Sequence, residues 1–304
     1  MPYVPLKGRW LLLLTTISVA LSLVPLAFLA LLWEEWTWEV ETFELLRGLE
    51  LFWSISIYDL VFLIPVCAIA PFAVIQYMNG RYVDAIERSM SSFFKGVADG
   101  IRSGMPMVKS LEVTARSISG PLGREMLDVV SAVELGSSLE RALENMLDRV
   151  ATPGLKRAAN LLITAYRSGG RVADVLDAAA EMYEMIGSYE EERRSSLAPY
   201  VWTVYVALAV FLTISTILVT VFVAPLYRLK GTAFFTPLPP PLFKAVFFFA
   251  SFVQAVSGGL VAGKMSKGTV KAGLFHSLIL MSTVIVYFTL LEIWLEPVLL
   301  LNLP

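Results

Sequence analysis

Residues 190–227 read EEERRSSLAPYVWTVYVALAVFLTISTILVTVFVAPLY, and this stretch decides the fold. Five consecutive charged residues, 190–194, are followed by 33 positions, 195–227, without a charged side chain. A helix needs about 20 apolar residues to cross the hydrocarbon core of a bilayer. The stretch therefore predicts a charged segment that leads directly into a membrane span.

Four further segments, on both sides of this stretch, are long and apolar enough to span a bilayer. The predicted spans cover residues 10–33, 52–78, part of 195–227, 245–263 and 272–291. Hydrophobic residues make up 57% of the 304 positions, which exceeds the roughly half that is usual in soluble domains. The sequence predicts an all-α integral membrane protein with about five transmembrane helices.

A polar block, residues 81–194, separates the second predicted span from the third. It holds 15 of the 24 Lys and Arg residues and 17 of the 26 Asp and Glu residues. Because the two signs nearly balance, no strong field favours nucleic acid as a ligand. Apolar residues recur at helical spacing, as at Leu139, Leu143 and Leu147, and we expect them inside a bundle of about six helices.

The chain therefore divides into three parts. Residues 1–80 hold two N-terminal transmembrane helices joined by an acidic connection, and residues 195–304 hold three C-terminal transmembrane helices. Residues 81–194 form the six-helix domain inserted between spans two and three, and its last helix is expected to run on towards span three.

Glycines mark the predicted turns of the polar block. Gly104, Gly136 and the pair Gly169 and Gly170 each stand just before a new amphipathic segment. A glycine at a helix end commonly adopts the left-handed conformation. The alternative, a phosphate-binding turn, is disfavoured because the chain contains no G-x-x-x-x-G-K-[ST] sequence.

The turn at Gly136 also carries a signal for a helix start. Ser137 and Glu140 fit a capping box, in which each side chain accepts a hydrogen bond from a free backbone amide. Further breaks are expected at Pro121 and Pro153, because proline is favoured in the first turn of a helix.

The orientation follows from the basic residues in the connections. Two basic residues precede the first span, and three lysines without any acid occupy the connection 264–271. The connection 34–50 has six glutamates and a single arginine. Arg228 and Lys230 oppose the trend, but the count favours a cytoplasmic N-terminus and polar block with an outer C-terminus.

Three local sequences carry a family resemblance. They read SGMPMVKSLE from Ser103, LGSSLERALENM from Leu135 and SGGRVADVLDAAAEMYE from Ser168, and a long span follows them. In order and spacing they resemble the type II secretion F-domain family, the inner-membrane platform proteins of type II secretion, type IV pili, tight-adherence pili and the archaellum. The several spans around a single domain are similar to the archaeal and tight-adherence branches.

The resemblance implies a non-enzymatic platform in the cell membrane. A hexameric secretion ATPase would dock on the cytoplasmic domain, and pilin-like subunits would be moved from the bilayer into a filament. Larger relatives have two such domains, so a homodimer, or a pairing with a second F-domain protein, would restore the doubled arrangement. No cofactor and no metal are implied.

Charged residues beside the turns are the candidate contacts to the ATPase. Arg102 and Lys109 flank the turn at Gly104, and Glu134 and Arg141 flank the turn at Gly136. Such side chains can offer charge-assisted hydrogen bonds to a partner.

A transporter or channel subunit is the alternative function. It predicts paired ionisable residues near the middle of the bilayer, and the predicted spans lack such pairs. Asp59 and Glu292 are the acids most embedded in apolar sequence, and acids within a membrane are functional candidates. Both lie near predicted outer ends, where they can also reach lipid headgroups. His276 is the only histidine and Cys67 the only cysteine, which makes an enzyme a poor third alternative.

The predicted topology is testable by cysteine labelling. We expect Lys267→Cys, with Cys67 replaced by serine, to react with a membrane-impermeant maleimide only after the membrane is permeabilised. Labelling of this position in intact cells would contradict the orientation.

Overall fold

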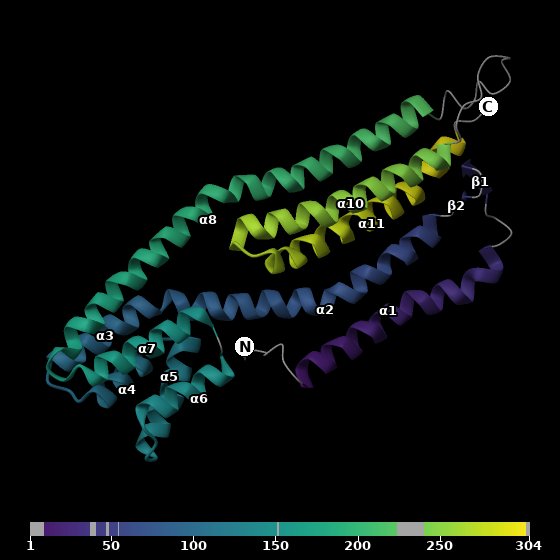
Figure 1. Ribbon diagram of the computed structural model, residues 1–304. Coiled ribbons are helices and arrows are strands. Elements are labelled where there is room, and N and C mark those ends of the chain that lie inside the picture. Colours follow the sequence, from purple (N-terminus) through teal and green to yellow (C-terminus); the bar gives the residue numbers. More distant parts are fainter. Residues whose placement is uncertain are drawn as a thin grey trace, which may run out of the picture. The chain divides into compact units, whose positions relative to one another are not determined.

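The computed structural model describes residues 9–36, 41–46, 49–53, 55–150, 152–223 and 240–301 (Figure 1). The chain forms two compact units. The first, called here the helical domain, comprises Tyr77–Ser196 together with Met1–Trp10. The second, called the membrane unit, comprises Leu11–Gln76 and Leu197–Pro304.

Five helices are long and apolar enough to cross a membrane, which confirms the predicted number of spans for the described residues. They are α1 (Arg9–Trp36), α2 (Ile55–Arg88), α8 (Val172–Ile217), α10 (Pro240–Lys267) and α11 (Val270–Leu301). A π-helical segment, Leu218–Val223, extends α8. A short antiparallel hairpin, β1 (Glu41–Leu46) with β2 (Leu49–Trp53), lies in the connection between α1 and α2 and was not expected from the sequence.

No helix ends at the two positions where the sequence changes between apolar and polar composition. Helix α2 continues past residue 81 to Arg88, and α3 begins at Met90. Helix α8 runs without a break from Val172 through the charged run and past Pro199 to Ile217, as expected. Hydrogen bonds along a helix join backbone groups, so a helix can pass from a polar to an apolar segment unchanged.

The helical domain is built from short helices joined by tight turns. They are α3 (Met90–Arg102), α4 (Met107–Ser117), α5 (Pro121–Glu134), α6 (Leu139–Arg149) and α7 (Pro153–Arg167), with the first part of α8. The sequence analysis predicted about six helices in residues 81–194. Pro121 and Pro153 each open a helix, as expected from their place in the sequence.

A single core of buried side chains holds these helices together. Phe93, Phe94 and Leu143 are fully buried. The ring of Phe94 stacks on Tyr183 of α8 at a centroid distance of 5.4 Å, and the Tyr183 hydroxyl donates a 2.8 Å hydrogen bond to the Gly154 carbonyl of α7. Leu147, which the periodicity placed inside, is only partly buried against this core.

In the membrane unit, α10 and α11 form a hairpin whose helices lie side by side (Figure 1). Small residues allow the close approach: a Cβ atom at Gly263 would overlap the backbone of Gly273, and one at Gly259 would overlap the backbone of Ser277. The Ser277 hydroxyl also donates a 3.0 Å hydrogen bond to the Val256 carbonyl. Small residues and hydroxyl groups at the interface are typical of helix pairs in a bilayer.

The burial of Leu143 predicts the effect of truncating it. We expect Leu143→Ala to lower the free energy of unfolding by about 2–5 kcal/mol, because the cavity is only partly refilled. The matched control is Leu135→Ala, since Leu135 is 89% exposed and its truncation should change stability by no more than about 0.5 kcal/mol. Denaturant titration of the full chain in detergent, followed by far-ultraviolet circular dichroism, measures both. Equal effects of the two variants would contradict the described core.

Candidate partner-binding surface

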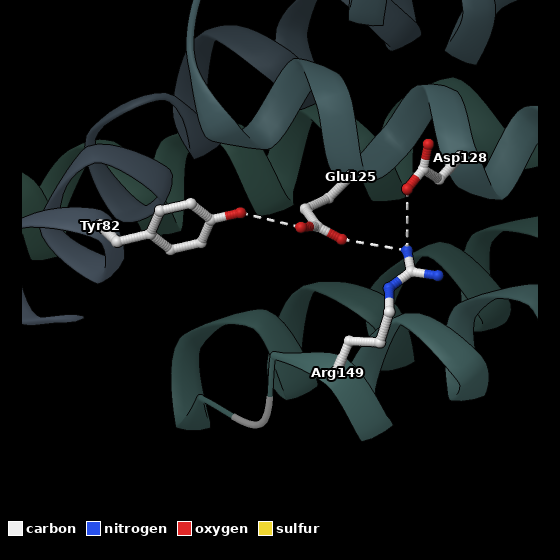
Figure 2. Close-up of polar contacts among 4 residues, drawn as sticks. All are labelled: Tyr82, Glu125, Asp128 and Arg149. Atoms are coloured by element: carbon white, nitrogen blue, oxygen red, sulfur yellow. Dashed lines mark hydrogen bonds and ion pairs between the residues drawn. The ribbon is translucent and has the colours of Figure 1, made fainter. Parts of the chain in front are cut away.

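Helices α5 and α6 are clamped together at one end by a charged network, which Figure 2 shows. Arg149 at the end of α6 donates hydrogen bonds of 3.1 Å to Glu125, in the first half of α5, and to Asp128, at the middle of α5. The Tyr82 hydroxyl of α2 donates a 2.8 Å hydrogen bond to the other oxygen of Glu125. The network therefore fixes the α5–α6 pair to the end of α2.

The start of α6 is fixed by a cap and by an ion pair. The cap is Ser138, whose hydroxyl accepts a 3.3 Å hydrogen bond from the backbone N–H of Arg141. The predicted capping box of Ser137 and Glu140 is therefore wrong by one residue. Glu140 instead accepts hydrogen bonds of 2.9 and 3.0 Å from the guanidinium of Arg167, at the end of α7.

Between these fixed ends lies the α5–α6 turn, defined here as residues 134–141. Gly136 has a φ of 98°. Its N–H donates to the Val133 carbonyl, and the N–H of Ser137 donates to the Ala132 carbonyl, at 2.9 and 3.0 Å. This pair of bonds is the Schellman motif, which satisfies the last carbonyls of a helix. The turn is therefore a defined structure and can present its side chains in fixed positions.

The other predicted glycine turns have similar features. Gly104 has a φ of 87° and closes α3 with the same pair of hydrogen bonds, from its own N–H and from that of Met105. Gly169 has a φ of 62°. Gly170 lies within a single 3-10 turn, Gly169–Arg171.

Two of the four candidate contact residues have partners inside the domain. Arg102 forms ion pairs with Asp99, at 3.5 Å, and with Asp177 of α8. Lys109 lies 2.7 Å from Glu112. These two side chains stabilise the domain itself and are therefore less available to a partner.

Glu112 is shared between two cations. Lys109 and Arg116 both donate to its carboxylate, at 2.7 and 3.0 Å. These hydrogen bonds hold the pKa of the Glu112 carboxyl below its usual range. The exposed side of α4 thus carries a locally compensated cluster of charge.

The other two candidates, Glu134 and Arg141, are exposed, and in the part of the chain that the structure describes neither forms an ion pair. Leu135 lies between them and is 89% exposed. The sequence analysis missed Leu135, although the signal was present. It is the residue just before the C-terminal glycine of a helix, where a side chain can project beyond the core. The α5–α6 turn thus combines an exposed leucine with unpaired charges of both signs.

Polar groups within the predicted spans also have partners. Asp59 accepts a 2.9 Å hydrogen bond from the Thr289 hydroxyl, while its second carboxylate oxygen is buried and has no hydrogen-bond partner among the described residues. The side chain of Glu292 lies outside the described residues. His276 shares a 2.8 Å hydrogen bond through Nδ1 with the Tyr205 hydroxyl, which ties α11 to α8.

Five short helices and the first part of α8, inserted in the sequence between apolar spans, define a multi-pass membrane protein with a folded helical domain. Residues 93–220 match the model of the family described as Type II secretion system (T2SS), protein F. Residues 93–220 therefore form a domain of that family, whose members are membrane platform proteins. The match begins in α3 and ends in the π-helical segment Leu218–Val223 that follows α8.

An uncharacterized protein of Methanocaldococcus jannaschii is 23% identical to the chain over 214 residues, which cover 70% of this chain and 35% of that protein. The chain therefore spans about a third of the length of this relative. A relative from an archaeon agrees with the archaeal branch suggested by the arrangement of spans. No solved structure matches the chain.

The Tyr82 hydrogen bond predicts a measurable contribution to stability. We expect Tyr82→Phe to lower the free energy of unfolding by about 0.5–1.5 kcal/mol, because Glu125 loses a hydrogen-bond donor. The matched control is Tyr166→Phe, since Tyr166 is 51% exposed and makes no hydrogen bond among the described residues. The same denaturant titration measures both, and an effect of Tyr166→Phe as large as that of Tyr82→Phe would argue against the network.

Proposed function

We propose that this protein is the membrane platform of a type IV filament or type II secretion-like machine. In this proposal the helical domain lies in the cytoplasm and binds a hexameric secretion ATPase, and the membrane unit acts on pilin-like subunits. The observation that carries it is the family match over residues 93–220, which covers most of the helical domain and continues into an apolar span.

We further propose that the α5–α6 turn is the contact to the ATPase. Leu135 offers an apolar side chain at 89% exposure, and exposed apolar groups rimmed by polar residues mark interaction sites. Within the described part of the chain, Glu134 and Arg141 form no internal ion pair that a partner would have to break, so both charges are available to pair with a partner. Rim charges of this kind mainly set the encounter rate and the register of a complex.

Helix α8 supports the coupling step. A domain that moves with a bound ATPase transmits that movement only if a stiff element joins it to the bilayer. Helix α8 is continuous over 46 residues, from the helical domain into an apolar span. The proposed orientation, with the N-terminus inside, places the helical domain on the side where ATP is available.

If the α5–α6 turn is the contact, substitutions in the turn should weaken binding of the ATPase. We expect the triple variant Glu134→Arg, Leu135→Asp, Arg141→Glu to lose most of its affinity for the cognate secretion ATPase while remaining folded, because all three side chains are exposed. Co-purification of the ATPase with the tagged platform from detergent extracts, and filament assembly in cells, measure the effect.

The matched control is Lys95→Glu, a reversal at an exposed site of α3 that should leave ATPase binding unchanged. Arg102→Glu is a poor test, because it also breaks the ion pair to Asp177. Normal ATPase binding by the triple variant would exclude the α5–α6 turn as the contact. ATP hydrolysis by the purified chain alone would overturn the platform function itself.

A further inference from the structure

Asp59 of α2 carries a partly buried carboxyl group that the proposed function does not use. Its Oδ2 atom lies 2.9 Å from the hydroxyl oxygen of Thr289 on α11. Its Oδ1 atom is buried and has no hydrogen-bond partner among the described residues. A buried oxygen without a donor lowers stability, and it does so far more when it carries charge. The contact between α2 and α11 therefore depends on the protonation state of this carboxyl group.

The Thr289 hydroxyl has one proton and two oxygen neighbours. Besides Asp59, it lies 2.8 Å from the carbonyl oxygen of Ile285, four residues earlier on α11. A carbonyl oxygen only accepts hydrogen bonds, whereas a hydroxyl donates one proton and accepts through its lone pairs. Other hydroxyl groups of the membrane unit donate to the carbonyl four residues before them, for example those of Thr213, Ser251 and Thr283. We therefore assign the Thr289 proton to Ile285.

This assignment leaves the contact between Asp59 and Thr289 without a proton unless Asp59 supplies one. An ionised Asp59 can only accept, and it would compete with the Ile285 carbonyl for the single hydroxyl proton. A protonated Asp59 instead donates from Oδ2 to the Thr289 oxygen, which donates in turn to Ile285. Each contact then has its own proton, and the unpartnered Oδ1 is a carbonyl oxygen rather than part of an anion.

The side chains around Asp59 also favour the neutral acid. Phe62, one turn further along α2, packs against three phenylalanine rings of α10, with ring centroids 5.1, 5.1 and 4.3 Å away, those of Phe248, Phe249 and Phe252. Phe288, next to Thr289, packs on the same group, with its ring centroid 5.1 Å from that of Phe248. Aromatic rings cannot replace the water that an anion loses on burial.

Asp59 is also isolated from other charges. It is the only Asp, Glu, Lys or Arg in the predicted spans 10–33, 52–78, 195–227, 245–263 and 272–291. Among the side chains that the structure describes, Asp59 forms no ion pair. An unbalanced charge inside a bilayer is costly, and acids in such places are often functional.

The other titratable groups of the neighbouring helices are few. Charged residues border this region in the sequence, namely Glu34 and Glu35 near the end of α1, Lys244 near the start of α10 and Glu292 on α11. Within the apolar part of α11, His276 hydrogen-bonds to Tyr205 of α8 at 2.8 Å, and the Tyr287 hydroxyl lies 2.6 Å from that of Thr216 of α8. His276 and Tyr287 are therefore engaged with α8.

We propose that Asp59 is a proton-binding site of the membrane unit, which holds a proton at neutral pH and donates it to Thr289. The ligand is the proton itself. Binding it joins α2 to α11 through the two hydrogen bonds that end at Ile285. Loss of the proton leaves a buried anion and removes one of these bonds, so the α2–α11 contact responds to the supply of protons. The proposal does not rest on the ATPase or on the filament.

Dicyclohexylcarbodiimide tests for the bound proton in native membranes, because this apolar reagent reacts with protonated carboxyl groups inside a bilayer. The acid proton moves to a nitrogen of the reagent and the carboxyl oxygen bonds to its central carbon, so no atom is lost. We expect mass spectrometry to find the reagent on Asp59 at neutral pH and to find less in alkaline buffer. Asp59→Asn should abolish this modification, whereas Glu292→Gln should retain it. Modification confined to Glu292, or equal at both pH values, would overturn the proposal.

A second measurement does not require the reagent to reach a buried group. Asparagine is neutral and can donate from its amide nitrogen to Thr289, so Asp59→Asn imitates the proton-bound state. An exposed aspartate is ionised at neutral pH, so the folded chain holds one proton more at this position than the unfolded chain. The stability that comes from this proton is therefore full in acid and is lost as the pH rises.

Thermal unfolding of the full chain in detergent, followed by circular dichroism across this pH range, measures the effect. We expect Asp59→Asn to match the melting temperature of the wild type in mildly acidic buffer and to exceed it in alkaline buffer. The matched control is Asp148→Asn, a substitution at an exposed aspartate of α6, which should follow the wild type at every pH. Thr289→Val should lower the melting temperature even in acid, because it removes the hydroxyl that receives the proton. An Asp59→Asn curve parallel to that of the wild type would overturn the proposal.

Discussion

The core of the helical domain closes on two helices that also run into apolar spans. Ile86 of α2 and Tyr183 of α8 are buried in the same cluster as Phe94, whose ring stacks on Tyr183. Burying a side chain of this size stabilises a fold by about 1.5–3 kcal/mol. Moving either α2 or α8 out of the cluster would therefore expose buried apolar side chains and lower the stability of the domain. The α5–α6 pair, clamped to α2 through Tyr82 and Glu125, depends on this closure for its position.

The sequence was sufficient where structure is decided locally. Gly136 and Gly104 end their helices with positive φ, and Pro121 and Pro153 begin theirs. Each of these effects depends on the allowed backbone angles of one residue. The spans were equally predictable, because a helix that crosses a bilayer needs a long uncharged run. The family followed from the order of such local signals along the chain.

The other features of the fold and of the candidate surface depend on tertiary contacts and could not be derived from the sequence. Arg102 was expected to face a partner, but it pairs with Asp177, which lies on another helix far along the chain. Ser137 and Ser138 are adjacent and equally able to cap, and only the path of the turn selects Ser138. Leu135 fits an apolar helical pattern, yet its position at the helix end leaves it exposed. Periodicity reports which residues are apolar but not which of them the fold covers.

Helix α8 illustrates this limit and what can be learned from it. Leu176 and Val175 are neighbours in sequence, and on a helix one residue is a rotation of about 100°. The core covers the side of Leu176 and Tyr183 but not the side of Met185 and Tyr189. A hydropathy pattern merges the two faces into one broad apolar arc. Tertiary contacts, and not the hydropathy pattern, therefore decide which face of α8 the helical domain covers.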